Sequence, residues 1–225
     1  MDFAIFRKFY EILGTIVPTD VIIASSTSGL TMTEIQKFCS TPERTIIAHP
    51  FNPPYLLPLV EIVGGKKTSN SAVEWAKKFY EQAGKKPLVM NKEIPGFVAT
   101  RLQEALWREA LHIVNEGYAT TKDLDRAIED GPGLRYSLMG TFLTFHLAGG
   151  KAGMKHMLEQ FGPALKLPWT KLKAPKLSKK LSERLISGTK KQAKGKSINQ
   201  LSNIRDEYLV NLQNLRKKYE NKIRK

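Results

Sequence analysis

Apolar and polar positions follow two different periods along the first ninety or so residues. Residues 3–13 carry apolar side chains at helical spacing and predict an amphipathic helix that ends near Gly14. The short β-branched runs that follow are typical of buried strands. The predicted strands are Val21–Ala24, Thr45–Ala48, Leu59–Val63 and Lys86–Met90, and the predicted helices between them are 31–38 and 69–83. This alternation indicates part of an open α/β sheet.

The pattern changes near residue 94, and no strand is predicted beyond it. An apolar stripe at helical spacing comes first, and Thr120 with Asp123 then forms a capping-box pattern that opens another helix. Further predicted helices are 151–160, 179–187 and a last one from Ser197 with Leu201, Ile204, Tyr208, Leu212 and Leu215 on one face. The chain therefore divides into an α/β domain, residues 1–93, and an all-α domain, residues 94–225.

The net charge of +15 is confined to the last third of the chain. Residues 1–150 contain 16 Lys/Arg and 16 Asp/Glu, whereas residues 151–225 contain 20 and 5. No aromatic-rich strand accompanies these cations to stack on nucleic-acid bases. We interpret the charge as a solvated Lys-rich surface and expect neither nucleic acid nor membrane as a partner. A basic protein associated with nucleic acid is the alternative.

Three features of the sequence indicate the cellular compartment of the protein. The single cysteine, Cys39, cannot form a disulfide within the chain, which fits a reducing environment. The first ten residues lack the basic head and apolar core of a signal peptide. No apolar run approaches the roughly 18 residues of a membrane span. We therefore expect a cytoplasmic protein.

His49 and Glu61 flank the stretch HPFNPPYLLPLVE. Its prolines cannot continue a helix and favour an extended, turning path, which could lay the two side chains side by side on neighbouring strands. An imidazole held by a carboxylate takes a proton from a hydroxyl near neutral pH. The alternative is a buried histidine satisfied by a local carboxylate. The other histidines, His112, His146 and His156, have no partner at a metal-ligand spacing, so we expect no metal.

Several longer motifs resemble the 3-hydroxyacyl-CoA dehydrogenase superfamily. The motifs are SSTSGL, HPFNPPYLLPLVEIVGG and EIPGFVATRL, and the carnitine dehydrogenases within the superfamily are also similar in ALWREALHIVNEGYATTKDLD, GPGLRYSLMGTF, AGGKAGMKHM, FGPALKLPWTKL and SINQLSNIRDEYLV. The resemblance implies an α/β fold: a partial Rossmann-type parallel sheet, the C-terminal half of an NAD-binding domain, over residues 1–93. An all-α substrate and dimerisation domain would follow over 94–225. NAD is the implied cofactor and a homodimer the implied assembly.

The resemblance also implies roles for residues around His49. His49 is the expected catalytic base, Glu61 the carboxylate that orients it and stabilises its cation, and Ser28 the hydrogen-bond partner of the reacting oxygen. Ser26 and Asn52 are expected to line the nicotinamide site. The implied reaction oxidises a 3-hydroxyl to a ketone, with the hydride passing to NAD and the proton to His49. Without the resemblance, the favoured interpretation of Ser26 and Ser28 is that they are strand-end hydroxyls that cap the next turn.

A carnitine-like substrate has a quaternary ammonium, a hydroxyl and a carboxylate. Because a quaternary ammonium donates no hydrogen bond, aromatic faces are its usual partners, and Trp107, Tyr136 and Phe142 are candidates. Arg101 or Arg135 would bind the carboxylate through two parallel hydrogen bonds. For the aromatic residues, the alternative is packing in a helical core.

Thr100 departs from the family pattern, because the acyl-CoA enzymes have an asparagine after PGF that completes the site. This argues against an acyl-CoA substrate, although 3-hydroxyacyl-CoA dehydrogenase is the alternative enzyme and a non-catalytic association module the alternative of another class. The sequence contains no G-x-G-x-x-G phosphate turn. We therefore expect a chain that begins about halfway through the nucleotide domain, binds NAD poorly alone and has an aggregation-prone sheet edge.

Overall fold

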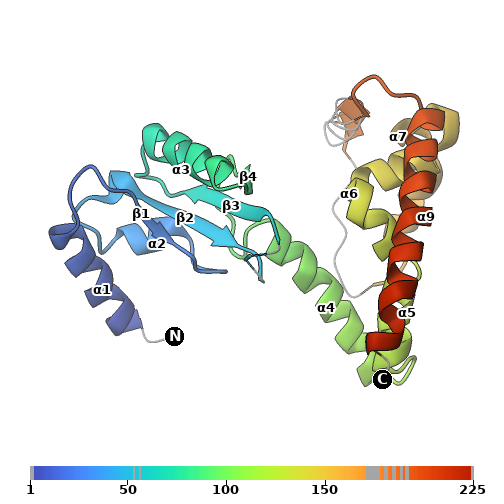
Figure 1. The fold of residues 1–225 in the computed structure, drawn as a ribbon, viewed down its shortest axis with the longest axis horizontal. Helices are drawn as coiled ribbons and strands as arrows, with labels where there is room; N and C mark the ends of the chain where they lie inside the picture. The colour runs from blue at the N-terminus through green and yellow to red at the C-terminus, as the bar shows by residue number, and fades with distance from the viewer. Residues whose placement is uncertain are drawn as a thin grey trace. The chain divides into compact units, whose positions relative to one another are not determined.

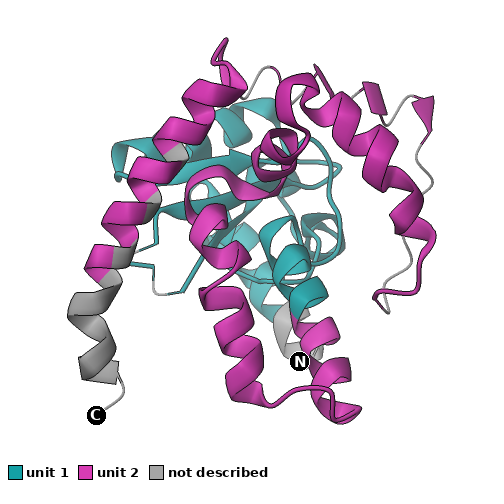
Figure 2. Ribbon diagram, turned by 90° about the vertical axis from the view of Figure 1, so that its right-hand side faces the viewer, with its two compact units in different colours: residues 1–106 teal, residues 107–225 magenta. Residues whose placement is uncertain are grey.

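The chain forms two compact units, Met1–Leu106 (unit 1) and Trp107–Lys225 (unit 2) (Figure 2). The computed structural model describes residues 3–52, 54–55, 57–170, 178–179, 182–183, 186–187, 190 and 193–223. The helix predicted at 179–187 therefore lies partly outside the described residues.

Unit 1 is built on a four-stranded sheet with the strand order β1-β2-β3-β4 (Figure 1). The strands are β1 (Ile23–Ser25), β2 (Thr45–Pro50), β3 (Leu59–Gly64) and β4 (Lys86–Val89). All four were predicted from the sequence, with ends that differ by at most two residues. The β1–β2 and β3–β4 pairs are parallel, but β2 and β3 are antiparallel. The segment 51–58 explains this difference, because it is too short for a parallel crossover.

Helices cover both faces of this sheet. On one face lie α1 (Phe3–Ile16) and α2 (Met32–Gln36), and on the other lies α3 (Asn70–Gln82) (Figure 1). Because successive strand residues point to opposite faces, the sheet contributes to two apolar cores. The first core contains Tyr10, Ile23, Met32, Ile35, Ile47, Val63 and Phe97, and the second contains Ile46, Ala48, Val60, Ile62 and Ala76.

Helix α1 was predicted to end near Gly14, and it continues two residues further, to Ile16. A Cβ at Gly14 would lie 2.3 Å from Ser40 Oγ, so this glycine serves a close approach between two segments. The buried Arg44 holds the C-terminal end of α1 instead. Its guanidinium donates to the carbonyl oxygen of Gly14, in the last turn of the helix, at 3.4 Å and to that of Val17, one residue beyond the helix, at 2.9 Å. Carbonyl groups that a helix end leaves unpaired are thereby satisfied.

In the part of the chain that the structure describes, unit 2 consists of helices joined by turns. Helix α4 (Ala99–Asn115) contains the boundary between the units, and the elements after it are α5 (Thr121–Glu129), α6 (Pro132–Ala148), η2 (Gly150–Ala152), α7 (Met154–Phe161), η3 (Gly162–Lys166) and α9 (Ile198–Ile223). Thr120 and Asp123 form the predicted capping box of α5. A small core joins α6 to α9 and contains Met139, Leu147, Ala193 and Leu201.

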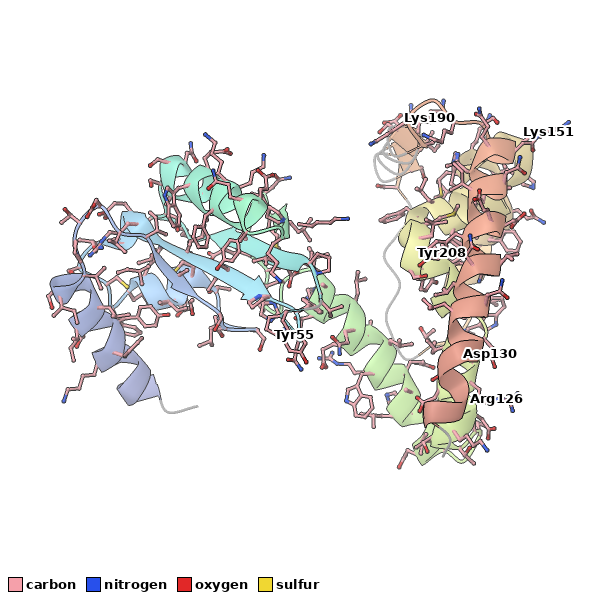
Figure 3. The ribbon with its side chains drawn as sticks, in the orientation of Figure 1. Tyr55, Arg126, Asp130, Lys151, Lys190 and Tyr208 are labelled. Atoms are coloured by element: carbon pink, nitrogen blue, oxygen red, sulfur yellow. The ribbon has the colours of Figure 1, made fainter. Side chains whose placement is uncertain are left out.

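The apolar face predicted on α9 is only partly buried. Leu201 is in the core, and Tyr208, which is labelled in Figure 3, donates through Oη to Ser137 Oγ of α6 at 3.1 Å. Ile204 and Leu215 are exposed. Among the helices that the structure describes, none combines the length and apolar character needed to cross a membrane.

Candidate active site

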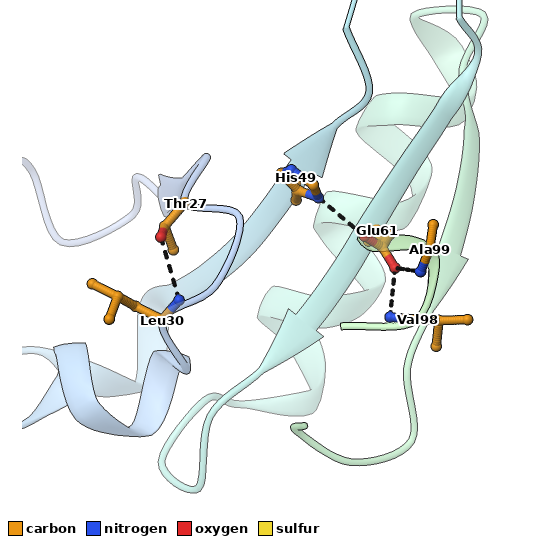
Figure 4. Close-up of polar contacts among 6 residues, drawn as sticks. All are labelled: Thr27, Leu30, His49, Glu61, Val98 and Ala99. Carbon is orange, nitrogen blue, oxygen red and sulfur yellow. Dashed lines mark hydrogen bonds and ion pairs between the residues drawn. The ribbon is translucent and has the colours of Figure 1, made fainter. Parts of the chain in front are cut away.

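His49 and Glu61 lie directly opposite each other on the antiparallel strands β2 and β3. His49 Nδ1 is 3.0 Å from Glu61 Oε2 (Figure 4). The Glu61 side chain is completely buried, and the His49 side chain is 11% exposed. The expectation that the proline-rich segment 51–58 would lay the two side chains side by side is therefore confirmed. They share the sheet face that α1 and α2 cover, because they lie two residues from Ile47 and Val63.

The second carboxylate oxygen of Glu61 binds the beginning of α4. The backbone N–H groups of Val98 and Ala99 each donate to Glu61 Oε1 at 2.8 Å (Figure 4). The N-terminus of a helix has unpaired N–H groups and a partial positive charge, so it favours a carboxylate at this point. Glu61 therefore stays buried as an acceptor with both oxygens paired.

This arrangement determines which nitrogen of His49 can act as a base. A carboxylate accepts hydrogen bonds, so the proton of the neutral imidazole lies on Nδ1 and Nε2 keeps a free lone pair. His49 Nε2 makes no hydrogen bond to a described residue. Among the described residues, every polar side-chain atom that is buried away from solvent has a hydrogen-bond partner. Solvent therefore reaches Nε2. The pair can take up a proton at Nε2 while Glu61 balances the charge.

Two phenylalanine rings pack against the imidazole. The ring centroid of His49 lies 5.4 Å from that of Phe51 and 5.6 Å from that of Phe97. Phe97 is completely buried and belongs to the apolar core under α1 and α2. Such surroundings limit the rotation of the ring and strengthen its interaction with Glu61 by keeping water away.

Ser26, Ser28 and Asn52, the other predicted site residues of unit 1, follow the carboxyl ends of β1 and β2. All three are exposed. Because Ser25 pairs in parallel with Ile47, the segment after Ser25 runs toward the end of β2 that carries His49. In open α/β sheets, ligands bind beyond the carboxyl ends of the strands, where this segment lies. In the part of the chain that the structure describes, no hydrogen bond joins these side chains to His49, so their roles stay predictions.

The predicted substrate residues divide between the two units. Thr100 and Arg101 lie in the first turn of α4, immediately after the N–H groups that bind Glu61. One guanidinium nitrogen of Arg101 donates to the carbonyl of Pro95 at 3.3 Å. The remaining predicted residues are exposed in unit 2, namely Trp107 on α4 and Arg135, Tyr136 and Phe142 on α6. Their part in substrate binding also stays a prediction.

Neither a nucleophilic thiol nor a metal centre competes with this interpretation among the described residues. Burial raises the pKa of the Cys39 thiol, and the Arg44 charge opposes this shift. A thiol with a raised pKa is a poor nucleophile at neutral pH. Within the described ranges, no three His, Cys, Asp or Glu side chains are grouped as metal ligands.

Sequence reasoning missed the contribution of Phe97, Val98 and Ala99. Two of these act through backbone N–H groups, which every residue except proline has, and their partner Glu61 is 37 residues or more away in the sequence. The one local signal was Pro95-Gly96, a dipeptide typical of a tight turn.

Comparison with known proteins supports the same interpretation. Residues 2–94 match the NAD binding domain of 3-hydroxyacyl-CoA dehydrogenase, and residues 96–195 match the C-terminal domain. The chain belongs to the 3-hydroxyacyl-CoA dehydrogenase family. An L-carnitine dehydrogenase of Bacillus cereus is 56% identical over 201 residues, which are 89% of this chain and 62% of that enzyme. An L-carnitine dehydrogenase of Oceanobacillus iheyensis is 57% identical, over 89% of this chain and 66% of that enzyme. The chain thus spans less than two thirds of these relatives.

A solved structure of this fold is 5-formyl-3-hydroxy-2-methylpyridine 4-carboxylic acid 5-dehydrogenase, described as an NAD+-dependent dismutase. It aligns with a TM-score of 0.67 and 25% identity over 97% of this chain and 70% of that one. The predicted fold class, an α/β sheet followed by a helical region, is therefore confirmed. The sheet is mostly rather than wholly parallel.

Proposed function

We propose that the protein takes part in the NAD-dependent oxidation of the 3-hydroxyl of L-carnitine, with His49 as the general base. The observation that carries this proposal is the 3.0 Å contact between His49 Nδ1 and the buried Glu61 Oε2. It leaves Nε2 as the nitrogen that accepts the hydroxyl proton. Positive charge then develops on the imidazole, and the Glu61 carboxylate stabilises it.

The residues present fit the nicotinamide end of NAD. Ser26 and Asn52 are exposed polar side chains at the carboxyl ends of β1 and β2, where a hydroxyl and an amide can hydrogen-bond a ribose or a carboxamide. When bound, NAD supplies the acceptor for the hydride. Ser28, on the same segment, would hydrogen-bond the substrate oxygen and hold its proton toward His49. The cytoplasm, where NAD is maintained, is the compartment that this proposal implies.

Two observations favour L-carnitine over an acyl-CoA substrate. The L-carnitine dehydrogenases named above exceed 50% identity with this chain. Thr100 also lies one residue after the Ala99 N–H that binds Glu61, where the acyl-CoA enzymes are expected to have an asparagine. A threonine can offer one hydroxyl but no amide. The aromatic residues Trp107, Tyr136 and Phe142, together with Arg101 or Arg135, are proposed to bind the quaternary ammonium and the carboxylate.

The test is NADH formation by the purified protein with L-carnitine, and in parallel with 3-hydroxybutyryl-CoA. The chemistry assigned to His49 predicts that His49→Gln lowers the rate with L-carnitine by about 10²- to 10⁴-fold, because a general base contributes that much. His112→Gln, at an exposed position of α4, is the matched control and is expected to retain the rate.

Each of the other possible results of this experiment favours a different function. Faster turnover of 3-hydroxybutyryl-CoA would replace L-carnitine by an acyl-CoA substrate. Equal rates for the wild-type protein and His49→Gln would remove His49 as the base. A folded protein that binds NAD but forms no NADH with either substrate would favour a non-catalytic association module.

We further propose a homodimer that forms through the helical unit. Exposed apolar side chains on its helices support this, including Phe145 of α6 and Ile204, Val210 and Leu215 of α9. Exposed apolar surface of this kind is typical of protein interfaces. Light scattering after size exclusion should give twice the chain mass of 25.4 kDa, and a single-chain mass would contradict the proposal.

A further inference from the structure

The chain makes an unusual turn at Gly96 and Phe97, just before α4. Gly96 has φ +76° and Phe97 has φ +50°. A bulky residue with positive φ is strained, and such strain costs about 1–3 kcal/mol. Among the described non-glycine residues only Phe97 and Lys194 have this conformation. Lys194 is exposed, but Phe97 is completely buried, so its strained backbone is held by the core around it.

The turn directs the N–H groups of the next two residues toward the same atom. Val98 and Ala99 both donate to Glu61 Oε1 at 2.8 Å, which leaves Oε2 for His49 Nδ1. The Phe97 side chain meanwhile packs on the imidazole itself, with 5.6 Å between ring centroids. One turn therefore fixes both members of the pair, Glu61 through backbone donors and His49 through an aromatic ring.

A second anchor holds the beginning of the same segment. Glu93 accepts a hydrogen bond from the Thr33 backbone N–H at 2.8 Å and another from the Thr33 hydroxyl. Thr33 is in the first turn of α2, which follows the segment that carries Ser28. Residues 93–99 thus connect the start of α2 to the carboxylate that holds His49.

We propose that the Gly96–Phe97 turn is a positioning element of the active site, which keeps Glu61 oriented so that His49 presents an unprotonated Nε2 to the substrate. This inference rests on the proposed function only where it concerns turnover. Phe97 is a positioning residue, because it acts through Glu61 and His49.

The test compares two glycines of nearly equal conformation. Gly96→Ala and Gly84→Ala each place a Cβ at a positive φ, +76° and +74°. Neither Cβ would clash, since the nearest atom to Gly96 is Arg101 Cγ at 3.4 Å and nothing lies within 4 Å at Gly84. Both variants therefore share the backbone strain, and only Gly96→Ala changes the turn whose next two N–H groups bind Glu61.

The decisive measurement is the nitrogen NMR spectrum of the His49 ring at neutral pH, assigned with His49→Gln. We expect wild type and Gly84→Ala to show a protonated Nδ1 and a bare Nε2. Gly96→Ala should show a mixture of tautomers, faster exchange of the Val98 and Ala99 amide protons, and a kcat about 10- to 100-fold lower with little change in KM.

A second variant covers the case in which Gly96→Ala does not fold. Ala99→Pro removes one donor to Glu61 at the first helical residue, where proline is tolerated. Thr121→Pro, at the first residue of α5, is its control. An unchanged His49 spectrum in the folded variants would overturn the positioning role. A changed spectrum in a protein that binds NAD but never forms NADH would instead refute the proposed function and leave the positioning role standing.

Discussion

His49 in unit 1 and His146 in unit 2 are held in opposite ways. The Nδ1 atom of each has one partner at nearly the same distance, 3.0 Å for His49 and 3.1 Å for His146. The partner of His49 is the acceptor Glu61, whereas the partner of His146 is the backbone N–H of Met154, a donor. The neutral His49 therefore has its proton on Nδ1, and the neutral His146 has its proton on Nε2.

This difference separates a histidine that can act as a base at Nε2 from one that caps a helix. His146 accepts from the first residue of α7, so it satisfies an N–H group that the helix leaves unpaired. Its lone pair is used there. Protonation of His146 would remove the acceptor, whereas protonation of His49 at Nε2 would strengthen the contact with Glu61. The partner of Nδ1, more than burial, determines what each ring can do.

Glu61→Gln would convert the first arrangement into the second and is expected to have the largest effect. An amide can still accept from Val98 and Ala99 with its oxygen, but its NH₂ would then donate to His49 Nδ1 and force the proton to Nε2. The rate of NADH formation from L-carnitine should fall by about 10²- to 10⁴-fold, because the base is lost. The His49 ring nitrogen spectrum should show the exchanged tautomer.

Glu34→Gln is the matched control for this change, since Glu34 lies exposed on α2 and pairs with Lys37. It should leave both the rate and the spectrum unchanged. A Glu61→Gln protein with a bare Nε2 and full activity would show that the carboxylate does not select the tautomer.

Gly153→Ala tests the other histidine and should have the next largest effect. Gly153 has φ +61°, and a Cβ there would lie 2.5 Å from His146 Cε1. Backbone strain and displacement of the ring together should lower the free energy of unfolding by about 2–5 kcal/mol. Urea denaturation measures this loss, and exchange of the Met154 amide proton reports the broken cap.

Gly150→Ala separates the two causes, because Gly150 has φ +59° but nothing within 4 Å of an added Cβ. It should cost only the strain, about 1–2 kcal/mol. Equal losses in the two variants would mean that His146 contributes nothing to the effect.

The sequence predicted the four strands of unit 1 and the His49–Glu61 pair for physical reasons that act locally. β-Branched runs favour buried strands, and the proline-rich segment 51–58 limits the connection between β2 and β3. It did not predict α6, whose pattern is interrupted by Gly133 and Gly140, with a positive φ at Gly140.

The parts of the site that escaped prediction depend on contacts between distant segments. The donors to Glu61 are backbone groups of Val98 and Ala99, and their direction depends on the strained turn at Phe97. The acceptor of the Thr33 N–H is Glu93, 60 residues away. No residue-type pattern encodes such contacts, because backbone N–H groups are common to nearly all residues and only the fold brings them to an acceptor.

The smallest expected effect is the pH dependence of the His146 cap. Burial lowers the pKa of His146 from its ordinary value of 6.5, and the Lys190 cation lowers it further. Above pH 6.5 the ring is neutral in the folded and unfolded states, so the cap contributes fully to stability. As the pH falls below that value, His146 takes up a proton more readily in the unfolded chain than in the folded one. The stabilisation by the cap is therefore lost as the pH falls through the pKa of His146 in the folded protein.

Protection of the Met154 amide proton against exchange, corrected for the intrinsic rate, should therefore decline on acidification in the wild-type protein. His146→Gln keeps an acceptor oxygen that does not titrate, so its protection should stay flat over the same pH range. His156→Gln removes an exposed histidine of α7, the helix that begins at Met154, and should behave as wild type. Parallel decline in wild type and His146→Gln would assign the loss to other groups, and the contrast between a cap-forming and a base-forming histidine would then rest on His49 alone.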